Sequence, residues 1–253
     1  MVDFDVRRQV IELEGSYNAR DLGGYPTRHG SRIQPRRFLR SGSLHGLSEN
    51  GRQTLLNLGV RYIVDLRSQL ERKQKPDPVE GDPEFFYHHV PMLDYINSTV
   101  AAGEMNFPDT MEEMYFGLLD HAGHSFAKVF EVFAQPSSYG ILFHCTAGKD
   151  RTGVVAMLLL ALAGAEEDLI VADYSISQDL VPSTPGEQLP NIPAYAFTSP
   201  PEIIRATLQH LNDRYGGVEP YLSLIGVTPQ QKEAVLAKLM EEGTAFSPGS
   251  IGF

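Results

Sequence analysis

The chain of 253 residues has a single cysteine, Cys145, and no tryptophan. One cysteine excludes an internal disulfide framework and any metal site built from cysteines alone. Long apolar runs are also missing, since the longest, "VVAMLLLALA" at 154–163, is too short to span a bilayer. The N-terminal "MVDFDVRRQV" has no apolar core and does not resemble a secretory signal. We expect a soluble cytoplasmic protein with no transmembrane segment, unless export proceeds without such a signal.

Positive charge is scarce and unevenly placed. The net charge is −11, but residues 1–75 hold 14 Lys and Arg against 8 Asp and Glu. An acidic chain argues against a nucleic-acid partner, because binding to phosphates needs a basic surface. The basic first third could still supply a local positive field, from Arg20, Arg36, Arg37, Arg40 and Arg67. Taken singly, each of these arginines is expected on an ordinary solvated face.

Strand-like and helical patterns alternate along the chain. Strands are predicted at 10–13, 37–40, 60–66, 85–90 and 140–144. Helices are predicted at 48–58, 111–134 (one or two helices), 152–163, 167–178, 201–215 and 228–243. This order predicts one α/β domain over 1–243, with a central, mostly parallel or mixed sheet flanked by helices. Within it, 179–200 is proline-rich and is predicted to be a lid or linker, and 244–253 a flexible tail.

The stretch "FHCTAGKDRTG", residues 143–153, places the cysteine between a predicted strand and a predicted helix. By itself, a free cysteine is usually a buried apolar residue. Here an apolar strand ends at His144, a loop follows, and a helix is predicted from Thr152. Unpaired N–H groups at a helix N-terminus bind anions, and a concave loop adds more of them. The order of elements therefore predicts an anion-binding loop.

The residue types in this loop suit phosphate chemistry. Gly148 lets the backbone approach a ligand closely, and the guanidinium of Arg151 can hold two phosphate oxygens at once. At the floor, the helix dipole and nearby cations favour the thiolate of Cys145, the form that attacks phosphorus. Thr152 can donate its hydroxyl to that sulfur. We expect His144 to orient the loop or to lie in the core, and not to act as a base.

The pattern H-C-x-x-G-x-x-R-T is the signature of the cysteine-dependent protein tyrosine phosphatase superfamily. The run "HCTAGKDRTG" resembles the atypical bacterial branch of that superfamily, which has mycobacterial members. Other segments are similar to that branch in the same order, and they are "NARDLGGY" (18–25), 37–68, "IVADYSISQD" (170–179) and 215–228. The mycobacterial member that this sequence resembles has a long helical lid after the segment that matches "VADY". Here the corresponding stretch is shorter and proline-rich, which predicts a more open site.

The resemblance implies a tyrosine-phosphatase-like fold without metal or cofactor. It implies two-step phosphomonoester hydrolysis through a phosphocysteine at Cys145. Inorganic phosphate would bind to Arg151 and to the loop residues Thr146, Ala147, Gly148, Lys149 and Asp150. The predicted substrate is protein phosphotyrosine, with phosphoserine and phosphothreonine as further candidates. Lys149 is shared with lipid-directed phosphatases, so the alternative is a phosphoinositide phosphatase; Lys149 could instead only deepen the positive field.

Two other functions fit the sequence less well. A catalytically dead phosphate-binding module usually lacks the cysteine or the arginine of the loop, and this chain has both. A sulfur transferase also uses a thiol in a loop, but the Lys-Asp-Arg-Thr that ends this loop indicates phosphoryl chemistry. The sequence therefore favours an active phosphatase.

The general acid is not fixed by the sequence. A carboxylic acid should protonate the leaving oxygen, and ordinary tyrosine phosphatases place this Asp on a loop with a tryptophan, which is missing here. The candidates are Asp150 in the loop, Asp65 at the end of a strand, and Asp94 or Asp109 before the loop. We rank Asp150 first and Asp65 second. The alternative for Asp65 is a structural ion pair with an arginine of the basic first third.

The single thiol leads to a prediction about oxidation. A thiolate is readily oxidised to sulfenic acid, and no second cysteine can trap that product as an internal disulfide. We expect activity lost to peroxide to return slowly unless a small thiol or a backbone sulfenamide intervenes. Recovery is measured after catalase treatment, with and without dithiothreitol. Rapid and complete recovery without thiol would contradict the prediction.

Overall fold

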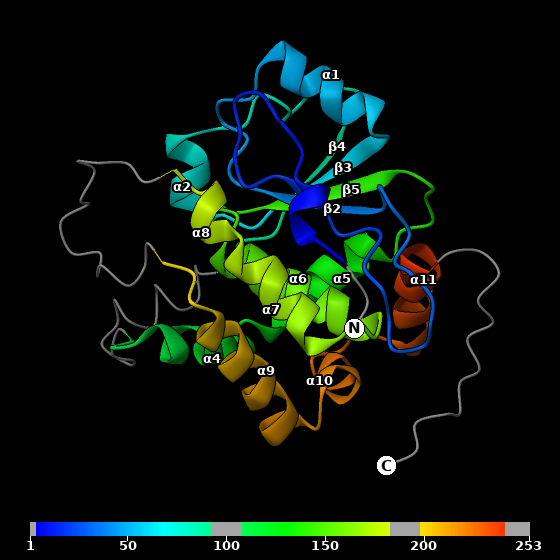
Figure 1. Ribbon diagram of the computed structural model, residues 1–253. Coiled ribbons are helices and arrows are strands. Elements are labelled where there is room, and N and C mark those ends of the chain that lie inside the picture. Colours follow the sequence, from blue (N-terminus) through cyan, green and yellow to red (C-terminus); the bar gives the residue numbers. More distant parts are fainter. Residues whose placement is uncertain (1–3, 93–107, 183–197, 241–253) are drawn as a thin grey trace.

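The computed structural model describes residues 4–92, 108–182 and 198–240. Within them a five-stranded sheet has the order β1-β2-β5-β3-β4 (Figure 1). Its strands are β1 (Arg20–Asp21), β2 (Phe38–Ser41), β3 (Val60–Asp65), β4 (Phe86–His89) and β5 (Gly140–His144). β1 is antiparallel to β2, and the other pairs are parallel. This confirms the predicted mixed, mostly parallel sheet. Most of the proline-rich stretch and the predicted tail lie outside the described residues.

The helices follow the predicted order, with additions. They are the 3-10 helix η1 (Val6–Gln9), α1 (Glu49–Asn57), α2 (Gln69–Gln74), α4 (Met111–His121), α5 (Gly123–Phe133), α6 (Asp150–Leu162), α7 (Glu167–Ser175), α8 (Ser177–Leu180), α9 (Pro201–Tyr215), α10 (Val218–Leu224) and α11 (Pro229–Leu239). The first residue of a helix was predictable where a side chain caps the helix, as Ser48 does for α1. The helices α2 and α10 were not predicted.

Two predicted boundaries are wrong. The run 10–13 is not a strand, because the chain turns back at Gly15 and only Val10 forms a bridge, to Arg20. The last helix ends at Leu239 and not at 243, because Met240 leaves the helical conformation and forms a bridge with Ile33. Only the second error arises from a pairing with a distant segment, since Ile33 and Met240 are far apart in the sequence.

The sheet has a separate apolar cluster on each face. In β5, Ile141 and Phe143 belong to the larger cluster and Leu142 to the smaller one, as the alternation of a strand requires. The smaller cluster includes Leu55 of α1, while residues of α4, α5, α6, α7, α9, α10 and α11 build the larger one. Figure 1 shows α1 and these other helices on opposite sides of the strands. Among the described helices, none is long and apolar enough to cross a membrane.

The central helix α6 and the sheet position the cysteine loop. Eleven of the 13 residues of α6 are buried, as its apolar run predicted. Its first residue is Asp150, two residues earlier than expected. Strands β2, β5 and β3 end level, since His144 pairs with Ser41 on one side and with Asp65 on the other. The loop therefore begins at the carboxyl edge of the sheet and leads directly into a helix that is buried along almost its whole length.

Candidate active site

The loop between β5 and α6 brings the thiol and the guanidinium together. Cys145 is 1% exposed and forms no disulfide. Burial would lower the pKa of Arg151, but its hydrogen bonds to Glu71 and the negative charge of Cys145 raise it above the usual arginine value. Burial and the same Cys145 charge raise the pKa of Tyr17. Arg151 and Tyr17 are thus groups whose pKa values respond to charge on Cys145.

The carbonyl groups of the loop are held from outside. The Asn18 amide donates to the carbonyl oxygens of Ala147 and Gly148, each at 3.0 Å. Arg40 donates to the Gly148 oxygen at 2.7 Å and to the Lys149 oxygen at 3.5 Å. In a trans peptide the C=O and the following N–H point in opposite directions. Holding these carbonyls outward therefore turns the next N–H groups toward the inside of the loop, where an anion would bind.

The same arrangement continues at Thr146 and behind Arg40. The Ser43 N–H, at 2.9 Å, and the Tyr17 hydroxyl, at 3.1 Å, donate to the Thr146 oxygen. Arg40 is fully buried and pairs with Asp173 at 2.5 Å. The segments 18–25, 37–68 and 170–179, which carry the family resemblance, thus meet around the loop and fix its backbone.

The backbone turns at Gly148, as predicted. Its φ is 67°, and a Cβ there would lie 2.3 Å from the carbonyl oxygen of Ser41. α6 then begins at Asp150, and no side chain caps its N-terminus. Its first N–H groups stay open to a ligand, with the positive end of the helix dipole behind them.

Glu71 is a site residue that the sequence reasoning missed. It forms a capping box with Ser68 at the start of α2. Its carboxylate accepts two hydrogen bonds from Arg151, at 2.7 and 2.8 Å, and a third from the Thr146 hydroxyl. Burial would raise the pKa of Glu71, but Arg151 and Thr146 lower it to about 2. The available signal was "SQLE" at 68–71, a capping box just after a strand.

This clamp leaves one edge of Arg151 open. Among the described residues, its hydrogen bonds use both Nη1 protons, on Glu71 and the Leu66 carbonyl, and one Nη2 proton, on Glu71. The Nε–H and the second Nη2–H lie parallel on the remaining edge. Two parallel donors match two oxygens of a phosphate.

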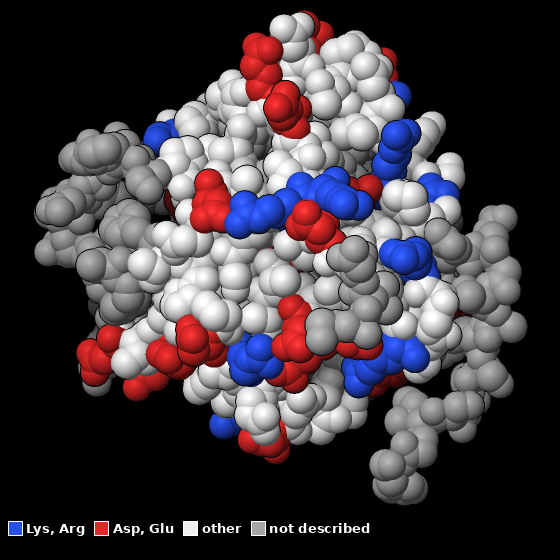
Figure 2. Space-filling model, viewed as in Figure 1, with Lys and Arg blue, Asp and Glu red and all other residues white. Residues whose placement is uncertain are grey.

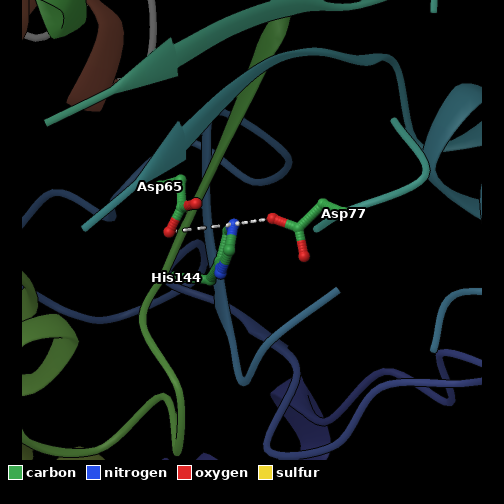
Figure 3. Close-up of side chains that lie close together, drawn as sticks. All are labelled: Asp65, Asp77 and His144. Carbon is green, nitrogen blue, oxygen red and sulfur yellow. Dashed lines mark ion pairs between the residues drawn. The ribbon is translucent and has the colours of Figure 1, made fainter. Parts of the chain in front are cut away.

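His144 lies between two buried carboxylates (Figure 3). Its Nε2 is 3.2 Å from Asp77 Oδ2 and 3.9 Å from Asp65 Oδ1, while its Nδ1 is 3.2 Å from the Cys145 carbonyl oxygen. Both ring nitrogens thus lie near oxygen acceptors, which favours the doubly protonated ring, although Nε2 makes no hydrogen bond with the described residues. Burial would lower the pKa of His144, but Asp65 and Asp77 raise it above the usual value. The surroundings of the residue before the cysteine therefore favour its charged form, and its ring contacts the loop at the Cys145 carbonyl.

Asp65, the second candidate for the general acid, is fully buried in an ion pair. Both of its oxygens accept from Arg67, at 2.9 and 2.8 Å, and Tyr87 donates to it at 2.6 Å. Burial would raise the pKa of Asp65, but His144 and Arg67 lower it well below its usual value. A carboxylate that stays ionised cannot donate a proton near neutral pH. The geometry favours the structural ion pair that was the alternative.

Asp65, Asp77 and His144 also have the composition of a metal site. One donor atom from each lies within 4.8 Å of the others. However, Arg67 contacts Asp77 at 2.5 Å as well as Asp65. The guanidinium and the imidazolium already neutralise the two carboxylates, so charge balance requires no ion there.

The remaining predicted residues lie at the start of α6. Asp150 is partly exposed, and its Oδ1 accepts from Tyr115 at 2.7 Å. Lys149 is 3% exposed; its Nζ donates to the Thr198 carbonyl at 2.8 Å and lies 3.4 Å from Asp150 Oδ1. The buried Thr152 hydroxyl has no hydrogen-bond partner among the described residues, so its predicted donation to the sulfur stays a prediction.

The two other acid candidates lie before α4. Asp109 is exposed, and its backbone N–H donates to Glu113 at 2.9 Å. Asp94 lies outside the described residues. Neither position adds support for an acid, so Asp150 remains the first candidate.

Three of the five arginines singled out from the sequence are not on a solvated face. Arg20, Arg40 and Arg67 are 0–1% exposed, whereas Arg36 is exposed. In Figure 2 a band of basic side chains crosses the middle of the visible face, where Figure 1 places η1. Arg7 of η1 pairs with Asp179 at 2.7 Å. Because Arg40 is buried, the positive charge that holds the loop carbonyls comes from inside the protein and not from this surface band.

The charge of His144 leads to a prediction about stability. Because folding raises its pKa, its contribution is complete below the ordinary value of about 6.5 and is lost as the pH rises through the folded value. Asp65 stays ionised throughout this range. We expect the difference in unfolding free energy between wild type and His144→Gln to shrink between about pH 6 and 9, by at most about 1.4 kcal/mol per pH unit.

Urea unfolding at a series of pH values measures this difference. His121→Gln, at an exposed position on α4, is the matched control. A difference that stays constant or grows with pH would show that His144 is not a buried cation.

Comparisons with known proteins agree with the loop. The model of the tyrosine phosphatase family matches residues 11–241. A tyrosine-protein phosphatase of Nostoc commune is 33% identical over 220 residues, covering 81% of this chain and 75% of the relative. The triple specificity protein phosphatase PtpB of Mycobacterium tuberculosis is 30% identical over 238 residues, covering 83% of this chain and 84% of PtpB.

Among solved structures, the catalytic core of the Saccharomyces cerevisiae PP-IP phosphatase SIW14 has a TM-score of 0.39 and 16% identity, covering 81% of this chain and 96% of that one. A score this low supports no conclusion about the present chain. The family match extends over nearly the whole chain, and both curated relatives are at least 30% identical across most of their own length. The resemblance predicted from the loop is confirmed. This chain belongs to the tyrosine phosphatase family.

Proposed function

We propose that this protein hydrolyses phosphotyrosine in proteins in two steps, with Cys145 as the nucleophile. The observation that carries the proposal is a buried thiol in the same loop as Arg151, with the loop carbonyls held by Asn18 and Arg40. The inward N–H groups from Thr146 to Arg151 and the open edge of Arg151 would bind the three phosphate oxygens that do not leave. This leaves the phosphorus facing the sulfur.

In the first step, the Cys145 thiolate attacks phosphorus and forms the S–P bond. The P–O bond to the tyrosyl oxygen breaks, and Asp150 gives that oxygen a proton. The Thr152 hydroxyl, which has no partner in the described structure, would donate to the sulfur when it becomes the leaving group. In the second step, water attacks phosphorus and gives its proton to the Asp150 carboxylate. The S–P bond breaks, and inorganic phosphate and the thiolate are released.

Protein phosphotyrosine is the first substrate to test, and phosphoserine and phosphothreonine are the next. The triple specificity in the name of PtpB supports including all three. The alternative, a phosphoinositide, was suggested by Lys149. In this structure its ammonium donates to Thr198 and is almost fully buried. This geometry does not add support for a lipid headgroup, which becomes one arm of the assay.

The central prediction concerns Cys145 and the acid. Cys145→Ser should lower kcat by roughly 10³-fold or more while phosphate still binds. Asp150→Asn should lower kcat for phosphotyrosine peptides by about 10²-fold and remove the basic limb of the pH profile. Asp65→Asn should mainly destabilise the fold, because it leaves Arg67 short of a carboxylate.

Phosphate release from phosphopeptides and from soluble inositol phospholipids measures turnover, and calorimetry with phosphate measures binding. Unchanged turnover in Cys145→Ser would sink the enzymatic mechanism. Loss of the basic limb in Asp65→Asn alone would move the acid to Asp65. A higher kcat/KM on the inositol lipids than on every phosphopeptide would favour the lipid alternative.

A second prediction concerns Glu71. Glu71→Gln keeps the shape of the side chain but removes the charge that orients Arg151. We expect kcat/KM to fall by about tenfold or more, mostly through weaker phosphate binding. Glu80→Gln is the matched control, because Glu80 pairs with Arg72 of the same helix α2. An equal loss in both variants would mean that the effect is a general loss of charge near α2.

A further inference from the structure

Two buried phenols lie in line behind the carboxyl of Asp150. Tyr115 of α4 is 0% exposed, and its hydroxyl lies 2.7 Å from Asp150 Oδ1. Tyr174 of α7 is 1% exposed, and its hydroxyl lies 2.8 Å from that of Tyr115. The two rings meet edge to face, with centroids 5.8 Å apart. Helix α4 thus places one phenol against the first residue of α6, and α7 places a second phenol against the first phenol.

The direction of this chain follows from counting protons. A phenol has one proton to donate, and Tyr115 gives it to the Asp150 carboxyl. Tyr115 can then only accept from Tyr174. If Asp150 is protonated while it accepts at Oδ1, its proton must be on Oδ2. The chain therefore distinguishes the two oxygens of a carboxyl that would otherwise be equivalent.

The neighbouring residues hold this geometry. Gly153 lies one turn along α6 from Asp150, and a Cβ there would come within 3.2 Å of the Tyr174 ring. Burial and the Asp150 charge raise the pKa of Tyr115 well above the usual tyrosine value, and burial raises that of Tyr174. Both phenols therefore stay protonated and serve as fixed hydrogen-bond donors.

We propose that Tyr115, itself held by Tyr174, is a positioning residue for Asp150: it fixes the carboxyl at Oδ1 and leaves Oδ2 to carry the proton for the leaving group. This rests on the proposed role of Asp150 as the general acid. The charged groups that face Asp150 are Lys149, at 3.4 Å, and Arg151. The Tyr115 hydroxyl donates to the same oxygen, Oδ1, that Lys149 approaches.

The test uses Tyr115→Phe and two substrates that differ in their need for an acid. Phenyl phosphate has a poor leaving group that requires a proton, and p-nitrophenyl phosphate has a good one that hardly does. Tyr115→Phe should lower kcat on phenyl phosphate by about tenfold and on p-nitrophenyl phosphate by less than about twofold. The basic limb of the kcat profile should move to higher pH by about half a unit, because a bond to the charged form is lost.

The controls separate positioning from packing. Tyr215→Phe removes a similar bond, since its phenol donates to Asp120 at 2.6 Å, and should leave both substrates unchanged. Tyr174→Phe should also lower kcat more on phenyl phosphate than on p-nitrophenyl phosphate, but by a smaller factor than Tyr115→Phe. In an Asp150→Asn background, Tyr115→Phe should have no effect on phenyl phosphate. Thermal unfolding of each variant shows whether it is folded.

The outcomes distinguish the two proposals. Equal losses on both substrates, or an unmoved basic limb, would overturn the role of Tyr115 while Asp150→Asn still shows the leaving-group dependence. If Asp150→Asn lowers kcat equally on the two substrates, the assignment of Asp150 as the acid fails, and the Tyr115 proposal fails with it. The enzymatic mechanism is then judged separately by Cys145→Ser. If Tyr115→Phe does not fold, Tyr174→Phe becomes the test. The proposal is overturned if Tyr174→Phe does not lower kcat more on phenyl phosphate than on p-nitrophenyl phosphate.

Discussion

The hydrogen bonds that Asn18 and Arg40 donate to the loop carbonyls are the constraint on which the site depends. Loop N–H groups favour an anion only when they point to one place, and each peptide reaches that orientation only if its carbonyl has a partner on the other side. Placing Arg40 there requires burying its charge, and Asp173 makes this possible. Arg20 shares that carboxylate at 2.8 Å. Two cations on one carboxylate leave a net positive charge buried beneath the loop, in a chain whose overall charge is −11.

The second buried network has a different charge balance. Arg67 and His144 face Asp65 and Asp77, so two positive charges meet two negative ones. A balanced group of this kind contributes little net field. Its ion-pair contacts instead connect the end of β3 and the residues after α2 to His144, the residue before Cys145. The protein therefore separates two tasks, because one network supplies positive potential and the other supplies rigidity.

The sequence predicts the residues of this site well when they lie near Cys145 in the chain, and poorly when their partners lie far away in the chain. Gly148, Arg151 and the strand–loop–helix order were predictable, because local geometry and the spacing from Cys145 decide them. Glu71 could not be assigned to Arg151, since the two are 80 positions apart and only the fold brings them together. Asp65 failed to stand out as structural for a different reason, since its main partner, Arg67, is only two positions away. Its position at a strand end suggested catalysis equally well, and its partners Tyr87 and His144 are known only from the register of the sheet.

The distribution of partners also supports the proposal that Asp150 is the carboxyl that transfers the proton. A general acid must be able to take up a proton at the working pH, and each cation bonded directly to a carboxylate makes this harder. Asp65 has both oxygens on one guanidinium, and Glu71 has both on another. Asp150 instead accepts its short hydrogen bond from a neutral phenol, with the Lys149 ammonium at 3.4 Å. The fold thus gives guanidinium partners to Asp65 and Glu71, and a phenol to the carboxyl that we propose as the general acid.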